Sequence, residues 1–274
     1  MDLSKVTTSF THLYFSLWRY RPLVLQMAKR EIAGRYRGSF LGLLWSFVNP
    51  VLMLAVYTFV FSIVFQARWR NDGGDRFEFA LVLFAGLIVF NLFSECVTRA
   101  PGLILANANY VKKVIFPLEI LPWVSLCSAL FHAAVNLAVL MIFLVVVGNG
   151  VPATVLLLPL VILPLFLLIM GVSWLLASIG VFIRDVGQFV GMLMTVLMFM
   201  SPIFYPVSAL PESVRGWLFL NPLTFIIEQA RDVAIWGKLP DWEGLALYTL
   251  LATGVAWAGL VWFQKTRKGF ADVL

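Results

Sequence analysis

Few polar side chains interrupt the long apolar stretches of this sequence, and those few are spaced so that they could act together. Asn91, Glu95 and Arg99 follow one another at intervals of four residues, which places them on one face of a helix. His132 and Asn136 repeat this interval in a later apolar stretch. The first set is typical of an ion pair at a helix end, and the second of a contact between helices. Both sets would also suit a polar strip that lines a pathway.

Motifs for nucleotide or metal chemistry are missing from the sequence. A phosphate-binding loop needs Ser or Thr after Gly-Lys, whereas Gly237-Lys238 precedes Leu239. No set of Cys and His residues has the spacing of a zinc site, so we predict no metal site. The two cysteines, Cys96 and Cys127, lie in apolar stretches and are predicted to be reduced. A process that consumes ATP would therefore need another chain to bind the nucleotide.

The composition of the chain identifies its class. Apolar residues make up 61% of the 274 residues and charged residues 12%, with a mean hydropathy of +0.93. Because soluble domains carry roughly 25% charged residues, these values exclude an ordinary soluble enzyme and a disordered chain. The apolar stretches are continuous rather than alternating, which indicates membrane-spanning helices and not the strands of a barrel.

Six apolar stretches are each long enough to cross a hydrocarbon core of about 30 Å. They cover residues 40–65, 79–98, 118–147, 153–183, 187–205 and 243–263. With both chain ends in the cytoplasm, fourteen of the 20 basic residues lie on the cytoplasmic side, as the positive-inside rule requires. The sequence thus predicts an all-α, polytopic membrane protein with a cytoplasmic segment, 1–39, before a transmembrane domain, 40–274.

The cytoplasmic segment is expected to contain an amphipathic helix on the inner leaflet. One helical face with basic neighbours recurs at steps of three and four and consists of Leu13, Leu17, Tyr20, Val24 and Met27. Pro22 suits the first turn of a new helix, and Gly34 and Gly38 suit a break before the first span. The alternative is a basic flank with no further role.

Two loops between the spans have structure of their own in this interpretation. In the cytoplasmic loop 99–117, Asn107 or Asn109 could cap a short helix, which Pro117 would end. The outer segment 202–242 is rich in proline, yet it carries an apolar helical face opposite Glu228, Arg231 and Asp232; that face consists of Leu223, Ile226, Ile227, Ala230 and Val233. We interpret this segment as a re-entrant helical hairpin before the last span, with an outer surface helix as the alternative.

Three stretches resemble a known family. Residues 29–50, KREIAGRYRGSFLGLLWSFVNP, resemble the start of the first span of ABC-2 type export permeases, above all the group that exports O-antigen, capsule and teichoic acid. Residues 182–188, FIRDVGQ, are similar to the second cytoplasmic loop of that group. Residues 201–206, SPIFYP, followed by Asn221-Pro222, are similar to its outer re-entrant segment. With the six spans, the resemblance covers essentially the whole chain.

The resemblance implies a half-transporter of the bacterial inner membrane. Two copies would form the membrane part, and two copies of a separate ATPase, which holds ATP and magnesium, would bind below them. The substrate would be a polysaccharide, commonly on a polyprenyl diphosphate lipid; no nucleic acid is expected, and membrane lipids surround the chain. The residues implied in docking the ATPase are Asn107, Asn109, Tyr110, Lys112, Lys113, Phe116, Arg184 and Asp185.

Basic and aromatic side chains are the predicted substrate contacts. Arginine binds phosphate oxygens bidentately, so a diphosphate at the inner headgroup level would meet Lys29, Arg30, Arg35 and Arg37. The positive-inside rule alone also accounts for these charges. Sugar rings could slide along the aromatic side chains of Trp45, Tyr57, Phe59, Phe199, Phe204 and Tyr205, although an interfacial belt explains such residues equally well.

The leading prediction is therefore a permease subunit with no catalytic site of its own. An exporter of small molecules from the same family is the first alternative. A membrane enzyme acting on polyprenyl phosphates is the second, and it would need paired acids near the inner surface to hold a metal. The acids expected on the cytoplasmic side are scattered along the chain, and no span carries the two or three carboxylates of an ion-coupled carrier.

Overall fold

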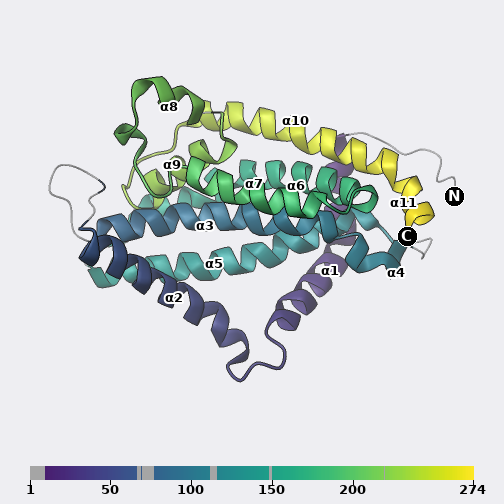
Figure 1. Cartoon of the computed structure of the whole chain (residues 1–274), viewed down its shortest axis with the longest axis horizontal. Helices are drawn as coiled ribbons and strands as arrows, with labels where there is room; N and C mark the ends of the chain where they lie inside the picture. Colours follow the sequence, from purple (N-terminus) through teal and green to yellow (C-terminus); the bar gives the residue numbers. More distant parts are fainter. Residues whose placement is uncertain (1–9, 67–68, 70–76, 112–115, 148–149, 219) are drawn as a thin grey trace.

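The described part of the chain is helical throughout. The structure, a computed structural model, describes residues 10–66, 69, 77–111, 116–147, 150–218 and 220–274, without the side chains of residues 10–17 and 214. Within these ranges there is no strand. The helices α3 (Glu78–Arg99), α5 (Leu121–Val147), α6 (Leu158–Phe182), α7 (Val186–Met200) and α10 (Trp242–Thr266) run roughly side by side along the long axis of the molecule (Figure 1).

Five of the six predicted spans are confirmed as helices that are long and apolar enough to cross a membrane. They are Gly42–Val64, Glu78–Gly102, Leu118–Val147, Ala153–Phe182 and Trp242–Val273. The first of these combines α2 (Trp45–Tyr57) with a π-helix, Thr58–Val64. The remaining predicted span, the fifth in chain order (187–205), corresponds to α7, which has only 15 residues and covers about 22 Å at 1.5 Å per residue.

The helix α3 forms the centre of the bundle. Sixteen of its 22 residues are buried, because α5, α6, α7 and α9 (Pro222–Ala234) all pack around it. On the far side of α6, α10 packs along much of its length through small residues. A Cβ atom on Gly259 would lie 2.1 Å from the carbonyl oxygen of Gly171, so these two helices can approach this closely only with glycine at the crossing.

The helix α1 (Phe10–Arg35) differs from the prediction in one respect. It continues through Pro22, so the expectation of a new helix at that residue is wrong. The ring removes one backbone hydrogen bond, and the helix persists because its apolar face is held by packing. Val24 and Ala28 are buried against Val124 near the N-terminal end of α5, as the amphipathic pattern predicts. Leu13 and Leu17 lie outside the side chains that the structure describes.

Glycines turn the chain between α1 and the first span, which confirms the predicted break at Gly38, whereas the expectation of a break at Gly34 is wrong because that residue lies inside α1. Gly38 and Gly42 have φ angles of +85° and +52°, which few other residues adopt without strain. In Figure 1 this turn is the vertex of a V whose arms are α1 and α2. The arms bring the end of α1 and the start of α2 to face α3 and α5.

The segment 202–242 forms two short helices, α8 (Glu212–Leu218) and α9, at the opposite end of the bundle from α4 (Ala108–Val111) and α11 (Phe270–Val273) (Figure 1). The Asn221 side chain caps α9 by accepting a hydrogen bond from the Leu223 amide. All five residues of the predicted apolar face of α9 are buried. The placement of Arg231 on the polar face is wrong, because its side chain is 1% exposed and packs into the bundle.

Candidate functional site

A polar pocket opens among the otherwise apolar helices on the side of the bundle that α1 and α2 face. Its volume is about 390 Å³. The lining comes from the chain just after α1, from α2, from α3 and from α5. The ten residues are Arg35, Tyr36, Ser46, Asn49, Pro50, Asn91, Ser94, Glu95, His132 and Asn136. All but Pro50 are polar, which is unusual for a chain with 61% apolar residues.

Helical spacing positions these side chains in pairs. Asn91 and Glu95 lie one turn apart on α3, and His132 and Asn136 lie one turn apart on the neighbouring helix α5. The two pairs therefore meet across the contact between α3 and α5. Glu95 and His132 make the predicted kind of contact between the two helices, and all four side chains line the pocket.

Glu95 is the centre of an ionic network. Its Oε1 atom lies 2.9 Å from Nη2 of Arg35 and 3.6 Å from Nη1 of Arg99, the i,i+4 partner that the sequence predicts. The second oxygen, Oε2, is 3.5 Å from Nδ1 of His132. Arg99 also pairs with Glu31 of α1. Arg35 and Arg99 therefore share the carboxylates of Glu31 and Glu95, and Glu95 neutralises the positive charge of Arg35.

His132 is held by hydrogen-bonding groups from the end of α1. Nη1 of Arg35 lies 3.0 Å from Nδ1 of the ring, and the Tyr36 hydroxyl lies 3.1 Å from Nε2. A neutral imidazole has one donor and one acceptor nitrogen, so when Nδ1 accepts from Arg35, Nε2 donates to the Tyr36 oxygen. These contacts fix the turn after α1 against α5.

The three asparagines of the pocket have no partner in the described part of the chain. The amides of Asn49, Asn91 and Asn136 make no hydrogen bond to another described residue, although each amide carries two donors and an acceptor. Asn49 and Asn91 are exposed and Asn136 is half-buried, so their amides are accessible to a partner from outside the chain. The pocket therefore offers free hydrogen-bonding groups to a polar occupant.

The four basic residues predicted to contact a diphosphate separate into two groups. Arg35 lines the polar pocket and is paired with Glu95. Lys29, Arg30 and Arg37 are exposed and form no ion pair with any described residue.

The six aromatic residues predicted to line a path do not form one surface. Phe199 and Phe204 stack with ring centroids 5.7 Å apart, and Tyr205 donates to the Phe199 carbonyl oxygen, so these three lie together near the outer end of α7. Tyr57 packs into the core and Phe59 is exposed. The sixth residue, Trp45, is half-buried at the start of α2.

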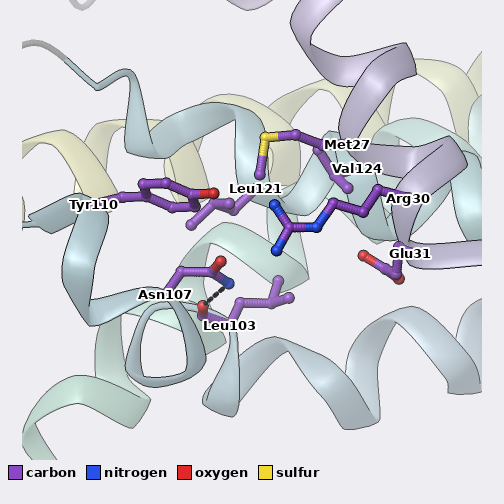
Figure 2. Close-up of a pocket in the computed structure, with 8 residues that line it drawn as sticks. All are labelled: Met27, Arg30, Glu31, Leu103, Asn107, Tyr110, Leu121 and Val124. Atoms are coloured by element: carbon purple, nitrogen blue, oxygen red, sulfur yellow. Dashed lines mark hydrogen bonds between the residues drawn. The ribbon is translucent and has the colours of Figure 1, made fainter. Parts of the chain in front are cut away.

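The end of the molecule that carries α4 has a second pocket, of about 180 Å³ (Figure 2). Figure 2 shows the Arg30 guanidinium pointing into it from α1, with Tyr110 of α4 on the far side. The Asn107 side chain donates to the Leu103 carbonyl oxygen and closes the turn before α4. Arg30 and Tyr110, which the sequence assigned to different roles, thus line one pocket.

The other predicted docking residues border the same region. Asn107 and Arg184 both line a neighbouring groove of about 470 Å³, which joins the loop after α3 to the loop after α6. Tyr110 stacks on Phe116 at 4.3 Å, while Asn109 and Asp185 are exposed. Two further predicted docking residues, Lys112 and Lys113, lie outside the described residues.

Sequence reasoning missed part of the polar pocket. Tyr36, Ser46 and Asn49 belong to it, yet none of them was predicted. A signal was present for Asn49, since an amide near the start of an apolar span needs a partner or a polar cavity. No local signal marks Tyr36 and Ser46, because their roles depend on the turn that folds the chain back at Gly38 and Gly42.

Comparisons with known proteins place the chain in a family. The sequence pattern described as "ABC-2 type transporter" matches residues 22–235. The chain is 31% identical to an O-antigen export system permease protein of Myxococcus xanthus, over 93% of this chain and 96% of the relative. It is 27% identical to a capsule polysaccharide export inner-membrane protein of Neisseria meningitidis serogroup B, over 94% and 96% of the two chains.

A third relative, a polysialic acid transport protein of Escherichia coli, is 26% identical over 87% of this chain and 91% of its own length. The pattern match covers more than half of the chain, and the similarity to the relatives extends over almost all of it. It agrees with the long apolar helices of the structure. This multi-pass membrane protein belongs to the ABC-2 type transporter family.

Proposed function

We propose that this chain is the permease subunit of an ATP-driven exporter of a lipid-linked polysaccharide such as O-antigen. The observation that carries the proposal is a polar pocket inside the apolar bundle of an ABC-2 permease whose relatives are named for polysaccharide export. A neutral polymer needs hydrogen-bonding groups along its way and little charge, and asparagine, serine and histidine side chains provide that environment.

The topology that we propose has six crossings, with both chain ends in the bacterial cytoplasm. The helix α7 and the segment 201–205 after it would together make the fifth crossing. The hairpin of α8 and α9 would re-enter from the outer side, with its polar groups satisfied by the protein around it. A second copy of the chain would complete the path, because one bundle with a one-sided pocket does not enclose a channel.

The proposed ATPase site is the cytoplasmic surface around α4 and the second cytoplasmic loop. The two pockets there share Asn107 and bring Arg30, Tyr110 and Arg184 into one area. Closure of the ATPase would push this area and transmit movement to α1 and α3, which border it. The diphosphate of the lipid carrier would bind the unpaired basic side chains of Lys29, Arg30 and Arg37 at the headgroup level.

Copurification with the partner tests this proposal directly. We expect the chain, co-expressed with the ATPase encoded nearest to it, to purify as a one-to-one complex. Its rate of ATP hydrolysis should change when a lipid-linked polysaccharide is added. Arg184→Glu should weaken the complex by reversing a charge on the proposed docking surface, while Lys238→Glu, on the exposed outer segment, should leave it intact. The proposal fails if no ATPase binds, or if only small amphiphiles alter hydrolysis.

A further inference from the structure

We infer that the polar pocket binds an uncharged, hydroxyl-bearing sugar ring of the exported lipid, the unit next to the lipid phosphate, and that it does not bind the phosphate itself. This inference rests on the proposed function and names the part of the substrate that the pocket receives. The residues that carry it are Asn49, Asn91 and Asn136, together with the ionic network of Glu95.

Charge compensation excludes the phosphate from the pocket. The charged side chains in its lining are Arg35 and Glu95, which pair at 2.9 Å, with His132 beside them. A diphosphate would have to pull Arg35 away from Glu95 and leave that carboxylate facing a second anion. Both changes cost free energy, because the Glu95 carboxylate is mostly buried and would lose its partner while it faces a second anion. The unpaired cations in and just after α1 that we propose for the diphosphate, Lys29, Arg30 and Arg37, do not line the pocket.

The unpartnered amides fit neighbouring hydroxyl groups. Each hydroxyl both donates and accepts a hydrogen bond, and an amide offers two donors and an acceptor on one plane. Asn91 and Asn136 present such groups from facing helices, and Asn49 adds a third from α2. Ser46 and Ser94 supply hydroxyls that can rotate to donate or accept. The lining can therefore form hydrogen bonds with several hydroxyls of one ring, whatever the stereochemistry of those hydroxyls.

The volume of the pocket and the weak binding expected in it also suit a sugar that must be released again during transport. A pocket of about 390 Å³ lies at the lower end of the range for small-molecule sites, roughly 300–1,000 Å³. Neutral hydrogen bonds to such a ring contribute little net free energy each, because the ring exchanges them for bonds to water. A site of this kind recognises the first sugar and then releases it, whereas a strong anion site would retain the substrate.

The test compares two carriers on the complete complex with its ATPase in lipid nanodiscs. One is polyprenyl diphosphate alone, and the other is the same lipid bearing a single N-acetylhexosamine. We expect the sugar-bearing carrier to alter ATP hydrolysis at a lower half-saturating concentration. Asn91→Leu and Asn136→Leu keep the volume of the side chain but remove the amide. Each should raise the half-saturating concentration of the sugar-bearing carrier by about threefold to tenfold, because it removes one hydrogen bond, and should leave that of the bare diphosphate unchanged.

Two further variants keep the test decisive. Asn49→Ala changes an exposed side chain on α2 and tests the same site if a leucine variant does not fold. Arg37→Gln is the matched control, since it should weaken both carriers equally. The inference is overturned if the asparagine variants weaken the bare diphosphate as much as the sugar-bearing carrier, or if neither is affected. If the wild-type complex responds to no carrier at all, the proposed function itself fails and the inference with it.

Discussion

At the scale of single residues, Arg231 shows how a charge can be stable inside this bundle. Its guanidinium donates to the carbonyl oxygens of Val82, Pro202 and Ile203 at 2.6–3.2 Å and to Glu228 at 2.7 Å. The Trp69 ring lies 4.5 Å from its Cζ atom. Arg231 thus connects α3, the 201–206 segment and α9, and the cation replaces its lost hydration with fixed protein groups.

Replacement of Arg231 should therefore be costly. Arg231→Met keeps the length of the side chain but leaves three backbone carbonyls and the Glu228 carboxylate without their donor. We expect a loss of about 3–5 kcal/mol of stability, seen as a clear fall in the Tm of the purified protein in detergent. Lys238→Met is the control, because the ion pair of Lys238 with Asp232 is exposed and such pairs are worth about 0–1 kcal/mol. Equal Tm values for the two variants would contradict this account.

At the scale of elements, the crossing of α6 and α10 depends on the absence of side chains. The Cβ atom of an alanine at position 171 would lie 2.5 Å from the carbonyl oxygen of Val255. The Cβ atom of an alanine at position 259 would lie 2.1 Å from the carbonyl oxygen of Gly171. Backbone atoms cannot yield as a flexible side chain can. Since helices in lipid gain little from the hydrophobic effect, close packing of this kind is a main source of their association.

The Gly259→Ala variant tests this crossing. It should force α6 and α10 apart and destabilise the protein by about 1–3 kcal/mol, the usual cost of overpacking. Gly254→Ala, on the same helix, has nothing within 4 Å of the new Cβ atom and should leave stability unchanged or raise it slightly, since alanine favours the helix. The measurement is again the Tm in detergent. A fall in Tm for both variants would mean that glycine at this helix is needed for flexibility and not for packing.

At the scale of the whole molecule, the two ends of the helical bundle carry different structural elements. One end carries α4, α11 and the Arg267–Glu119 ion pair, in which Nη1 and Oε2 are 2.8 Å apart, and the other carries α8 and α9 (Figure 1). Arg267 also donates to the Phe116 carbonyl oxygen, so the last helix holds the start of α5. The first end is the surface that we propose for the ATPase.

Labelling of single cysteines can establish which end faces the cytoplasm. In a variant with Cys96 and Cys127 replaced by alanine, we expect a membrane-impermeant maleimide to label Leu239→Cys on intact spheroplasts. Leu239 is exposed beside the outer helices. Lys268→Cys, exposed at the other end, should react only after the membrane is permeabilised. The reverse pattern would refute the proposed orientation and, with it, the cytoplasmic docking surface.

The sequence by itself determined the class of the protein and most of its helices. Hydropathy and helical periodicity are local properties, so five spans, the amphipathic face of α1 and the buried face of α9 could all be predicted from neighbouring residues. The turn at Gly38 could also be predicted, because a positive φ angle favours glycine, whereas Gly42 was not predicted and Gly34 proved helical. The length of α7 could not, since its apolar pattern continues past the residue where the backbone leaves the helix.

Only the tertiary structure decided which polar groups meet. Asn91 and Glu95 come from α3, His132 and Asn136 from α5, and Arg35 from the end of α1, and their encounter depends on how these elements pack. The same holds for Arg231, which a helical wheel places on the polar face and which finds its acceptors on two other segments. A sequence specifies the faces of each helix, but the free energy of a buried polar group depends on partners far away in the chain.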